Sequence, residues 1–361
     1  MFDIKKQIHS IYTISALSSF QIAGASWVAL LAARGFSMVE IGIAEGIFHL
    51  ASLSFEVPSG VIADVFGRKK SMILSQCMFL ISALLMAFSE GIVSVCVSLV
   101  FCAFGYNFSS GTREALAYDS LKKVGQEDGY LRYSSLEYSI YSIGNASAVL
   151  CAGLALFLGH RRAYLLDALL ALICLTQCFR LEEVVLEARQ FQGRIPERIL
   201  RCFRETFAFL RHGGRSIALM LWNSFIGSIS VLTAFFLQAR LPLTDMPDFL
   251  LGPLLFGISL GGAIGARLAE KAGAWRYGRV CLLCAAGTIL GLLLSLRQFP
   301  LIMALGGFLG YLFDDLLQVR TDALLNDRFP SSQRATLVSV SSLCFSLVMI
   351  LMSPLMGWLL S

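Results

Sequence analysis

Residues 41–70 read IGIAEGIFHLASLSFEVPSGVIADVFGRKK, a long apolar run that leads into a glycine and three consecutive basic residues. A helix needs about 20 residues to cross the hydrocarbon core of a bilayer, and Ile41–Ala63 supplies that length. Since backbone amides inside lipid must bond within their own segment, the run is expected to be helical. The stretch therefore predicts a spanning helix followed by a short basic turn.

Ten further apolar runs extend this pattern over almost the whole chain. Ala163–Phe179 and Phe299–Val319 carry a few ionisable groups. The others carry no charge and are Ile11–Ala33, Ser71–Ser89, Ile92–Thr112, Tyr138–Gly159, Ser216–Ala239, Phe249–Ala266, Val280–Leu296 and Ala335–Ser361. The composition, 57% hydrophobic and only 15% charged, agrees with a chain surrounded by lipid. The sequence predicts an all-α polytopic membrane protein with about eleven transmembrane helices.

The basic residues are distributed unevenly between the segments that join the runs. If the N-terminus lies in the cytoplasm, the inner segments hold 24 of the 29 Lys and Arg residues. The outer segments hold the other five, which are Arg34, Arg161, Arg162, Arg240 and Arg297. This bias predicts a multi-pass protein of the cell membrane with a cytoplasmic N-terminus. The net charge of +5 is explained by this placement, so no nucleic-acid partner is expected.

The sequence lacks the patterns of metal, redox and nucleotide chemistry. Most of the ten cysteines fall inside apolar runs, and the pair Cys281 and Cys284 has no second pair or nearby histidine. No Gly-x4-Gly-Lys-Ser/Thr phosphate loop, His-Glu-x-x-His or Gly-x-Ser-x-Gly occurs. We therefore expect no cofactor, no metal and no enzymatic activity.

The longest polar interval divides the runs into six and five. We predict an N-terminal six-helix bundle over residues 1–180, a linker over 181–215 and a C-terminal five-helix bundle over 216–361. In the linker, Ile199, Phe203, Phe207 and Leu210 recur at helical spacing, which indicates an amphipathic helix on the inner membrane surface.

The two halves share a weak internal repeat. Asp64 and Glu270 are 206 residues apart, and each precedes a glycine by three residues. The segments Glu114–Asp119 and Asp322–Asp327 match at an offset of 208. Duplicated halves are typical of secondary transporters, which bind substrate between the repeats.

Two segments resemble the major facilitator superfamily. The loop Gly60-x-x-x-Asp64-x-x-Gly67-Arg68-Lys69-Lys70 resembles its signature loop between the second and third helices. Residues 110–121, and 326–336, resemble bacterial members of its efflux-type branches. The resemblance implies two helical bundles, alternating access, and a conformational latch formed by Gly60, Asp64, Gly67, Arg68, Lys69 and Arg113.

The chain departs from the family pattern at three places. The fifth helix has no proline in Gly144–Gly153, and the fourth has no arginine between Ile92 and Ser110. Family members generally have twelve helices, whereas this sequence shows eleven, so the twelfth is expected to be missing. A truncated or decayed relative that acts as a membrane scaffold or sensor is therefore the alternative to a working carrier.

Ionisable groups inside spanning helices cost about 2.5 to 3.5 kcal/mol each, so each is a candidate for proton or ion coupling. Glu45, His49 and Glu56 share one face of the second helix with Ser52 and Gly60. Asp314 and Asp315 are adjacent in the tenth helix. The alternative role for both groups is hydrogen bonding between helices. Asp167 is expected to pair with Arg161 or Arg162.

Aromatic and amide side chains in the spanning runs are candidates for a substrate cavity. They are Gln21, Trp27, Tyr106, Asn107, Tyr138, Tyr141, Asn145, Trp222, Asn223, Tyr311 and Gln318. Such residues suit an amphipathic or hydrophobic ligand, although aromatic side chains also face lipid. We expect a monomeric secondary active transporter that exports small organic molecules, coupled to protons.

Overall fold

The computed structural model describes residues 2–184, 197, 200, 214–244, 246–328 and 334–361, except for the side chains of Asp64 and of residues 326–339. Within these residues the chain is helical and contains no strand. The helices are α1 Ile4–Ser19, α2 Ile22–Ala25, α3 Trp27–Ala33, α4 Met38–Phe66, α5 Arg68–Ala87, α6 Ile92–Ser109, α7 Thr112–Lys123, α8 Tyr130–Leu150, α9 Ala152–Leu158, α10 His160–Arg180, α12 Gly214–Arg240, α13 Leu251–Lys271, α14 Tyr277–Ser295, α15 Pro300–Arg328 and α16 Arg334–Leu359. Short 3-10 turns cover Glu127–Gly129, Leu241–Leu243, Asp248–Leu250 and Ala272–Ala274. The linker residues on which the predicted amphipathic helix depends, Ile199, Phe203, Phe207 and Leu210, lie outside the described residues.

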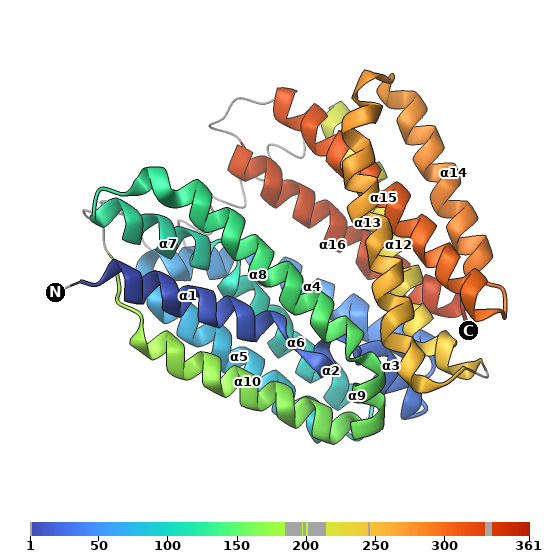
Figure 1. Cartoon of the computed structure of the whole chain (residues 1–361), viewed down its shortest axis with the longest axis horizontal. Helices are drawn as coiled ribbons and strands as arrows, with labels where there is room; N and C mark the ends of the chain where they lie inside the picture. The colour runs from blue at the N-terminus through green and yellow to red at the C-terminus, as the bar shows by residue number, and fades with distance from the viewer. Residues whose placement is uncertain (1, 185–196, 198–199, 201–213, 245, 329–333) are drawn as a thin grey trace. The chain divides into compact units, whose positions relative to one another are not determined.

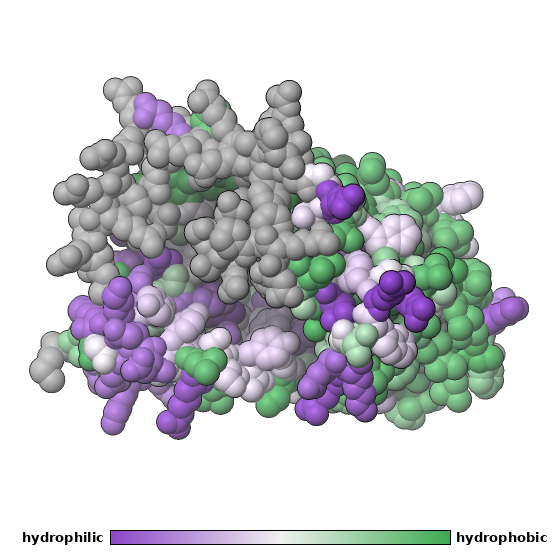
Figure 2. All heavy atoms as spheres, turned by 90° about the horizontal axis from the view of Figure 1, so that it is seen from above, coloured by the Kyte–Doolittle hydropathy of each residue, from purple (hydrophilic) through white to green (hydrophobic). Residues whose placement is uncertain are grey.

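Nine helical segments of the described part are long and apolar enough to cross a membrane, and α8 with α9, bent by 52°, makes a tenth. Many large apolar side chains are exposed on the described part of the chain, among them Val93, Leu282 and Leu351. Apolar side chains, green in Figure 2, also cover much of one face. Because lipid rather than water suits such surfaces, the predicted all-α membrane protein is confirmed.

The first predicted run, Ile11–Ala33, is not one helix, which accounts for the difference from eleven spans. The helix α1 ends at Ser19, and the short α2 and α3 follow after separate breaks. At Phe20 the backbone leaves helical geometry, with φ −94° and ψ 55°. These breaks could not be predicted from the sequence, since neither contains glycine or proline.

The chain divides into two compact units, which are described separately. Unit 1 holds the described residues of Met1–Ala25, Ala51–Cys151 and Leu158–Arg204, and unit 2 holds those of Ser26–Leu50, Ala152–Phe157 and Glu205–Ser361. The helix α4 contributes to both. The predicted boundaries at residues 180 and 215 stay a prediction.

In unit 1, α10 packs against α1, α2 and α5, and α5 also packs against α6 (Figure 1). A buried cluster joins α1 and α5 to α7 and α8 and includes Ile11, Ile14, Met72, Leu116 and Tyr133. The unit is therefore held by apolar contacts between segments far apart in sequence.

In unit 2, α15 packs against α12, α13 and α14. Glycines permit the closest approaches: Gly261 and Gly265 of α13 lie against the backbone of Phe308 and Leu312 in α15. Small residues bring helices together in this way in membranes, where dispersion contacts replace the hydrophobic effect. The first half of α4 packs in the same manner, with Gly42 against Ser353 of α16.

Candidate functional site

A cavity of about 460 Å³ lies within unit 1, between α1, α2, α5, α6 and α8. Its lining is rich in hydrogen-bonding groups and consists of Ile14, Ser18, Ser19, Gln21, Gly24, Ala25, Met72, Gln76, Phe79, Tyr106, Asn107, Ser109, Ser110, Gly111, Arg113, Glu114, Tyr141 and Asn145. Five of the predicted cavity residues come together here: Gln21, Tyr106, Asn107, Tyr141 and Asn145. Their role in binding stays a prediction.

The break between α1 and α2 places Gln21 at this cavity, and Asp167 of α10 holds the break. One carboxylate oxygen of Asp167 accepts a hydrogen bond from the Gly24 N–H at 2.9 Å. The N–H groups of Ile22 and Ala23 lie close enough to interact electrostatically with the same side chain. The first amides of a helix have no acceptor within it, so this carboxylate acts as their cap. The pairing expected with Arg161 or Arg162 is therefore wrong.

Two amides of the cavity differ in what they bind. Asn107 is engaged on both sides, because its Oδ1 accepts from the Ser52 hydroxyl at 2.9 Å and its Nδ2 donates to the Ser52 carbonyl at 2.8 Å. Gln76 of α5 is only 4% exposed, yet its amide has no hydrogen-bond partner among the described residues. Sequence reasoning missed Gln76, although it is one of few amides in an apolar run.

An ion pair lies at one end of the cavity. Arg113 is 3.0 Å from the Glu137 carboxylate and 3.7 Å from that of Glu114. The Ser15 hydroxyl of α1 donates to Glu137 at 2.8 Å. Sequence reasoning missed Glu137, because the charge-free run Tyr138–Gly159 starts one residue after it, whereas α8 begins at Tyr130. Tyr138 itself is 71% exposed and does not line the cavity.

The basic loop after α4 is built around Glu183, another residue that the sequence did not single out. Its carboxylate accepts the N–H groups of Arg68 and Lys69, each at 2.9 Å, and so caps α5. Gly67 adopts a φ of 101°, which a side chain would strain.

The side chains of the predicted latch have separate partners. Arg68 pairs with Asp119 at 3.0 Å, and the Lys69 ammonium donates to the Phe179 carbonyl at 3.0 Å. Arg113 binds Glu137 instead, and Gly60 is exposed on α4. The side chain of Asp64 lies outside the described part of the chain.

The predicted coupling residues on α4 are divided between the units. Glu45 and His49, each 8% exposed, form a pair at 3.3 Å in unit 2. The other ring nitrogen of His49 lies 3.4 Å from the Ser346 hydroxyl of α16. Glu56 is half-buried in unit 1. The pair Glu45 and His49 therefore belongs to the contact between α4 and α16, and it does not line the unit 1 cavity.

Asp314 and Asp315 point towards different helices of unit 2. Asp314 faces Gly227 of α12, where an added Cβ would meet its carboxylate at 3.2 Å, and Asp315 faces Gly262 of α13. Neighbouring side chains on a helix diverge by about 100°, so the two carboxylates approach different helices, and their role in proton or ion coupling stays a prediction.

The remaining predicted residues of unit 2 form a polar network and an aromatic contact. Asn223 donates to Gln318, whose amide donates to Asp322 at 3.0 Å. Thr321 donates to Asn223 at 3.2 Å. Trp27 meets Phe235 edge to face at 6.1 Å, Trp222 is exposed beside Phe225, and Tyr311 is half-buried.

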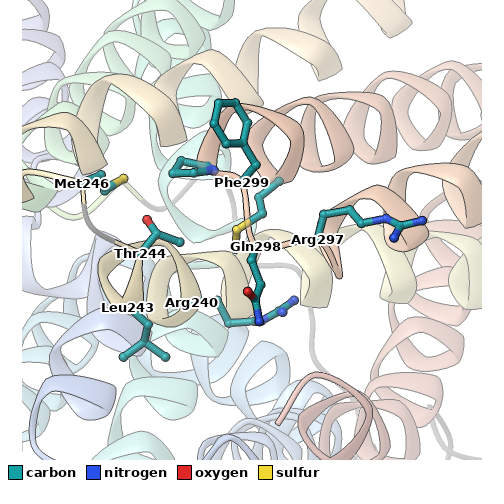
Figure 3. A pocket seen from close by; sticks show the side chains of 9 residues that line it. Arg240, Leu243, Thr244, Met246, Arg297, Gln298 and Phe299 are labelled. Carbon is teal, nitrogen blue, oxygen red and sulfur yellow. The ribbon is translucent and has the colours of Figure 1, made fainter.

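A second cavity, of about 620 Å³, lies in unit 2 beside the ends of α12 and α14 (Figure 3). Arg240 donates to the Ser295 carbonyl at 2.7 Å and thereby caps α14. The side chain of Arg297 points away from Thr244 and Met246 in Figure 3. The guanidinium groups are therefore not gathered around a common centre.

Comparisons with known proteins agree with this architecture. The model of the Major Facilitator Superfamily matches residues 9–313. The protein YxaM of Bacillus subtilis (strain 168), named an uncharacterized MFS-type transporter, is 32% identical over 124 residues, which cover 33% of this chain and 29% of that relative. The matched stretch thus spans less than a third of the relative's length.

Solved structures share the fold at low sequence identity. The nucleoside transporter NupG, as its D323A mutant, has a TM-score of 0.77 and 15% identity, over 98% of this chain and 90% of that one. A D-xylose-proton symporter has a TM-score of 0.66 and 13% identity, over 97% and 87%. From the helical fold, the signature loop and the matched family model, the chain belongs to the major facilitator superfamily.

Proposed function

We propose that this protein is a secondary active carrier that moves a small neutral organic molecule across the cell membrane by alternating access. The unit 1 cavity carries the proposal, since its volume and its amide and hydroxyl lining suit a small polar molecule. The exposed rings of Tyr106 and Tyr141 add planar surfaces for a ring-shaped substrate.

This lining modifies the expected substrate class. The sequence favoured amphipathic or hydrophobic compounds, whereas Ser18, Gln21, Gln76 and Asn145 offer hydrogen bonds. A bound hydrophobic compound would leave the buried Gln76 amide without a partner, at a cost of about 1–3 kcal/mol. Polar ring compounds therefore fit better, and the nucleosides and xylose named for the two similar structures are suitable first candidates.

Export coupled to protons is the proposed direction, supported by the resemblance of residues 110–121 to efflux-type members. The proposed topology places the N-terminus in the cytoplasm, supported by the excess of Lys and Arg in the inner segments. We propose that the monomer is the transporting unit.

The test is flux in proteoliposomes that contain the purified protein. Labelled nucleosides, xylose and a hydrophobic cation are supplied under an imposed pH gradient, with and without a protonophore. We expect one polar class to accumulate against its gradient and to lose that accumulation with the protonophore. If none of the compound classes moves, a non-transporting scaffold is favoured instead.

A further inference from the structure

Asp167 is a buried acid that the substrate cavity does not use directly. It is 3% exposed in α10, and one of its oxygens, Oδ1, is buried without a hydrogen-bond partner among the described residues. The other, Oδ2, accepts from Gly24 at 2.9 Å. Placing an acid inside a spanning helix costs free energy, and such acids are usually paired or functional. Because one oxygen of Asp167 has a hydrogen-bond partner and the other has none, Asp167 is a candidate for a functional role.

The partners of Asp167 are backbone amides rather than a cation. The N–H groups of Ile22, Ala23 and Gly24 begin α2 and have no acceptor within this four-residue helix. A negative carboxylate attracts them more strongly than a neutral carboxylic acid does. The charge on Asp167 therefore determines how firmly α2 is held away from α1.

Gly24 connects this carboxylate to the cavity. Both Gly24 and Gln21 line the cavity. The position that a Cβ on residue 24 would occupy is 3.1 Å from the Gln21 amide oxygen and 3.7 Å from Asp167 Oδ2. Glycine leaves this position open. A single methyl group placed there would contact both the Asp167 carboxylate and the Gln21 amide that lines the cavity.

Other ionisable groups do not account for the charge of Asp167. The helix α10 packs against α1, α2 and α5, and α2 has no ionisable side chain. The ionisable side chains on these packed helices are Lys5, Lys6, His9 and Tyr12 of α1 and Arg68, Lys69, Lys70 and Cys77 of α5. Among the described residues none of them forms an ion pair or hydrogen bond with Asp167, whose carboxylate accepts from Gly24. On its own helix Arg161 lies over the Phe88 ring instead.

We infer that Asp167 is the proton-binding residue that couples transport, and that it acts through the break between α1 and α2. A proton from the cavity adds to Oδ1, the carboxylate becomes neutral, and its hold on the α2 amides weakens. Gln21 then changes position at the substrate, and loss of the proton restores the cap. This inference rests on the proposed proton-coupled transport.

The test compares two activities of the same proteoliposomes: accumulation driven by a pH gradient, and exchange of labelled for unlabelled substrate at equal pH. Asp167→Asn retains an acceptor oxygen for Gly24 but cannot take up a proton. We expect exchange within about threefold of the original protein and gradient-driven accumulation at least about tenfold lower. Asp167→Glu, which can bind a proton, should recover part of the accumulation.

Two further variants complete the design. Gly24→Ala fills the open position between Asp167 and Gln21. Because Gly24 also lines the cavity, exchange should fall as well, but gradient-driven accumulation should fall by a larger factor. Asp128→Asn, at an exposed acid, is the matched control and should change neither activity.

Unchanged gradient-driven accumulation in Asp167→Asn would overturn the inference and leave Asp167 as a helix cap. If Asp167→Asn does not fold, unchanged gradient-driven accumulation in Gly24→Ala would overturn the inference instead. If the unaltered protein moves no substrate in either assay, the proposed function itself fails, which is a separate result.

Discussion

The guanidinium of Arg113 lies 3.0 Å from the carboxylate of Glu137 at the edge of the unit 1 cavity, and both side chains are largely buried. The Ser15 hydroxyl donates to the same carboxylate at 2.8 Å, so the pair joins α1, α7 and α8. Removing one member of a buried ion pair leaves the other charge without compensation.

Glu137→Gln should therefore destabilise the protein by about 3 kcal/mol, and Arg113→Leu by a similar amount. The double variant should be more stable than the sum of these effects predicts, because the Arg113–Glu137 pair is removed as a whole and only Glu114, 3.7 Å from Arg113, loses a partner. Thermal unfolding in detergent, analysed as a double-mutant cycle, measures the coupling. Additive losses would show that the two side chains do not compensate each other.

Gln76 and Asn107 provide a matched pair, since both amides line the cavity but only Asn107 has protein partners. Gln76→Ala should raise the KM for substrate by about five- to tenfold, because one hydrogen bond of about 1 kcal/mol is lost, with little change in unfolding temperature. Asn107→Ala should instead lower the unfolding temperature, since the Ser52 groups lose their partner. Equal effects of the two changes on KM would contradict the assigned roles.

Two glycines of α13 differ in their surroundings. An added Cβ at Gly265 would meet the Leu312 backbone of α15, whereas at Gly257 it would meet nothing within 4 Å. Gly265→Ala should cost about 2 kcal/mol or more, because two backbones must separate. Gly257→Ala should be neutral or stabilise by up to about 1 kcal/mol through helix propensity. Thermal unfolding of both variants distinguishes steric conflict from a general effect of replacing glycine.

Glu183 caps α5, whereas the neighbouring Glu182 is exposed. Glu183→Ala should lower stability by about 1 kcal/mol, the usual effect of losing a helix cap. Hydrogen exchange at the first amides of α5 should accelerate at the same time. Glu182→Ala is the control, and an equal acceleration in that variant would exclude the proposed cap.

The positions of the spanning helices could largely be predicted from the sequence. A run such as Val280–Leu296 has to be helical in lipid whatever its neighbours are, because its amides have no other acceptor. Ile11–Ala33 was the exception. Its break depends on Asp167, which is 143 residues away from Gly24 in the chain.

The candidate site was only partly predictable for the same reason. Gln21, Tyr106, Asn107, Tyr141 and Asn145 were found from residue type, and the structure places them around one cavity. Residue type could not reveal that Asn107 hydrogen-bonds to Ser52, whereas the Gln76 amide has no hydrogen-bond partner among the described residues.

The sequence by itself determined the helical membrane fold, the approximate spans and the superfamily, because hydrophobic length and the signature loop are local properties of the chain. Only the tertiary structure decided which polar groups satisfy one another. It placed Glu137 against Arg113, Glu183 on the α5 amides and Asp167 on the α2 amides. A buried polar group takes its partner from whichever segment packs beside it, and that neighbour is set by the packing of the whole unit.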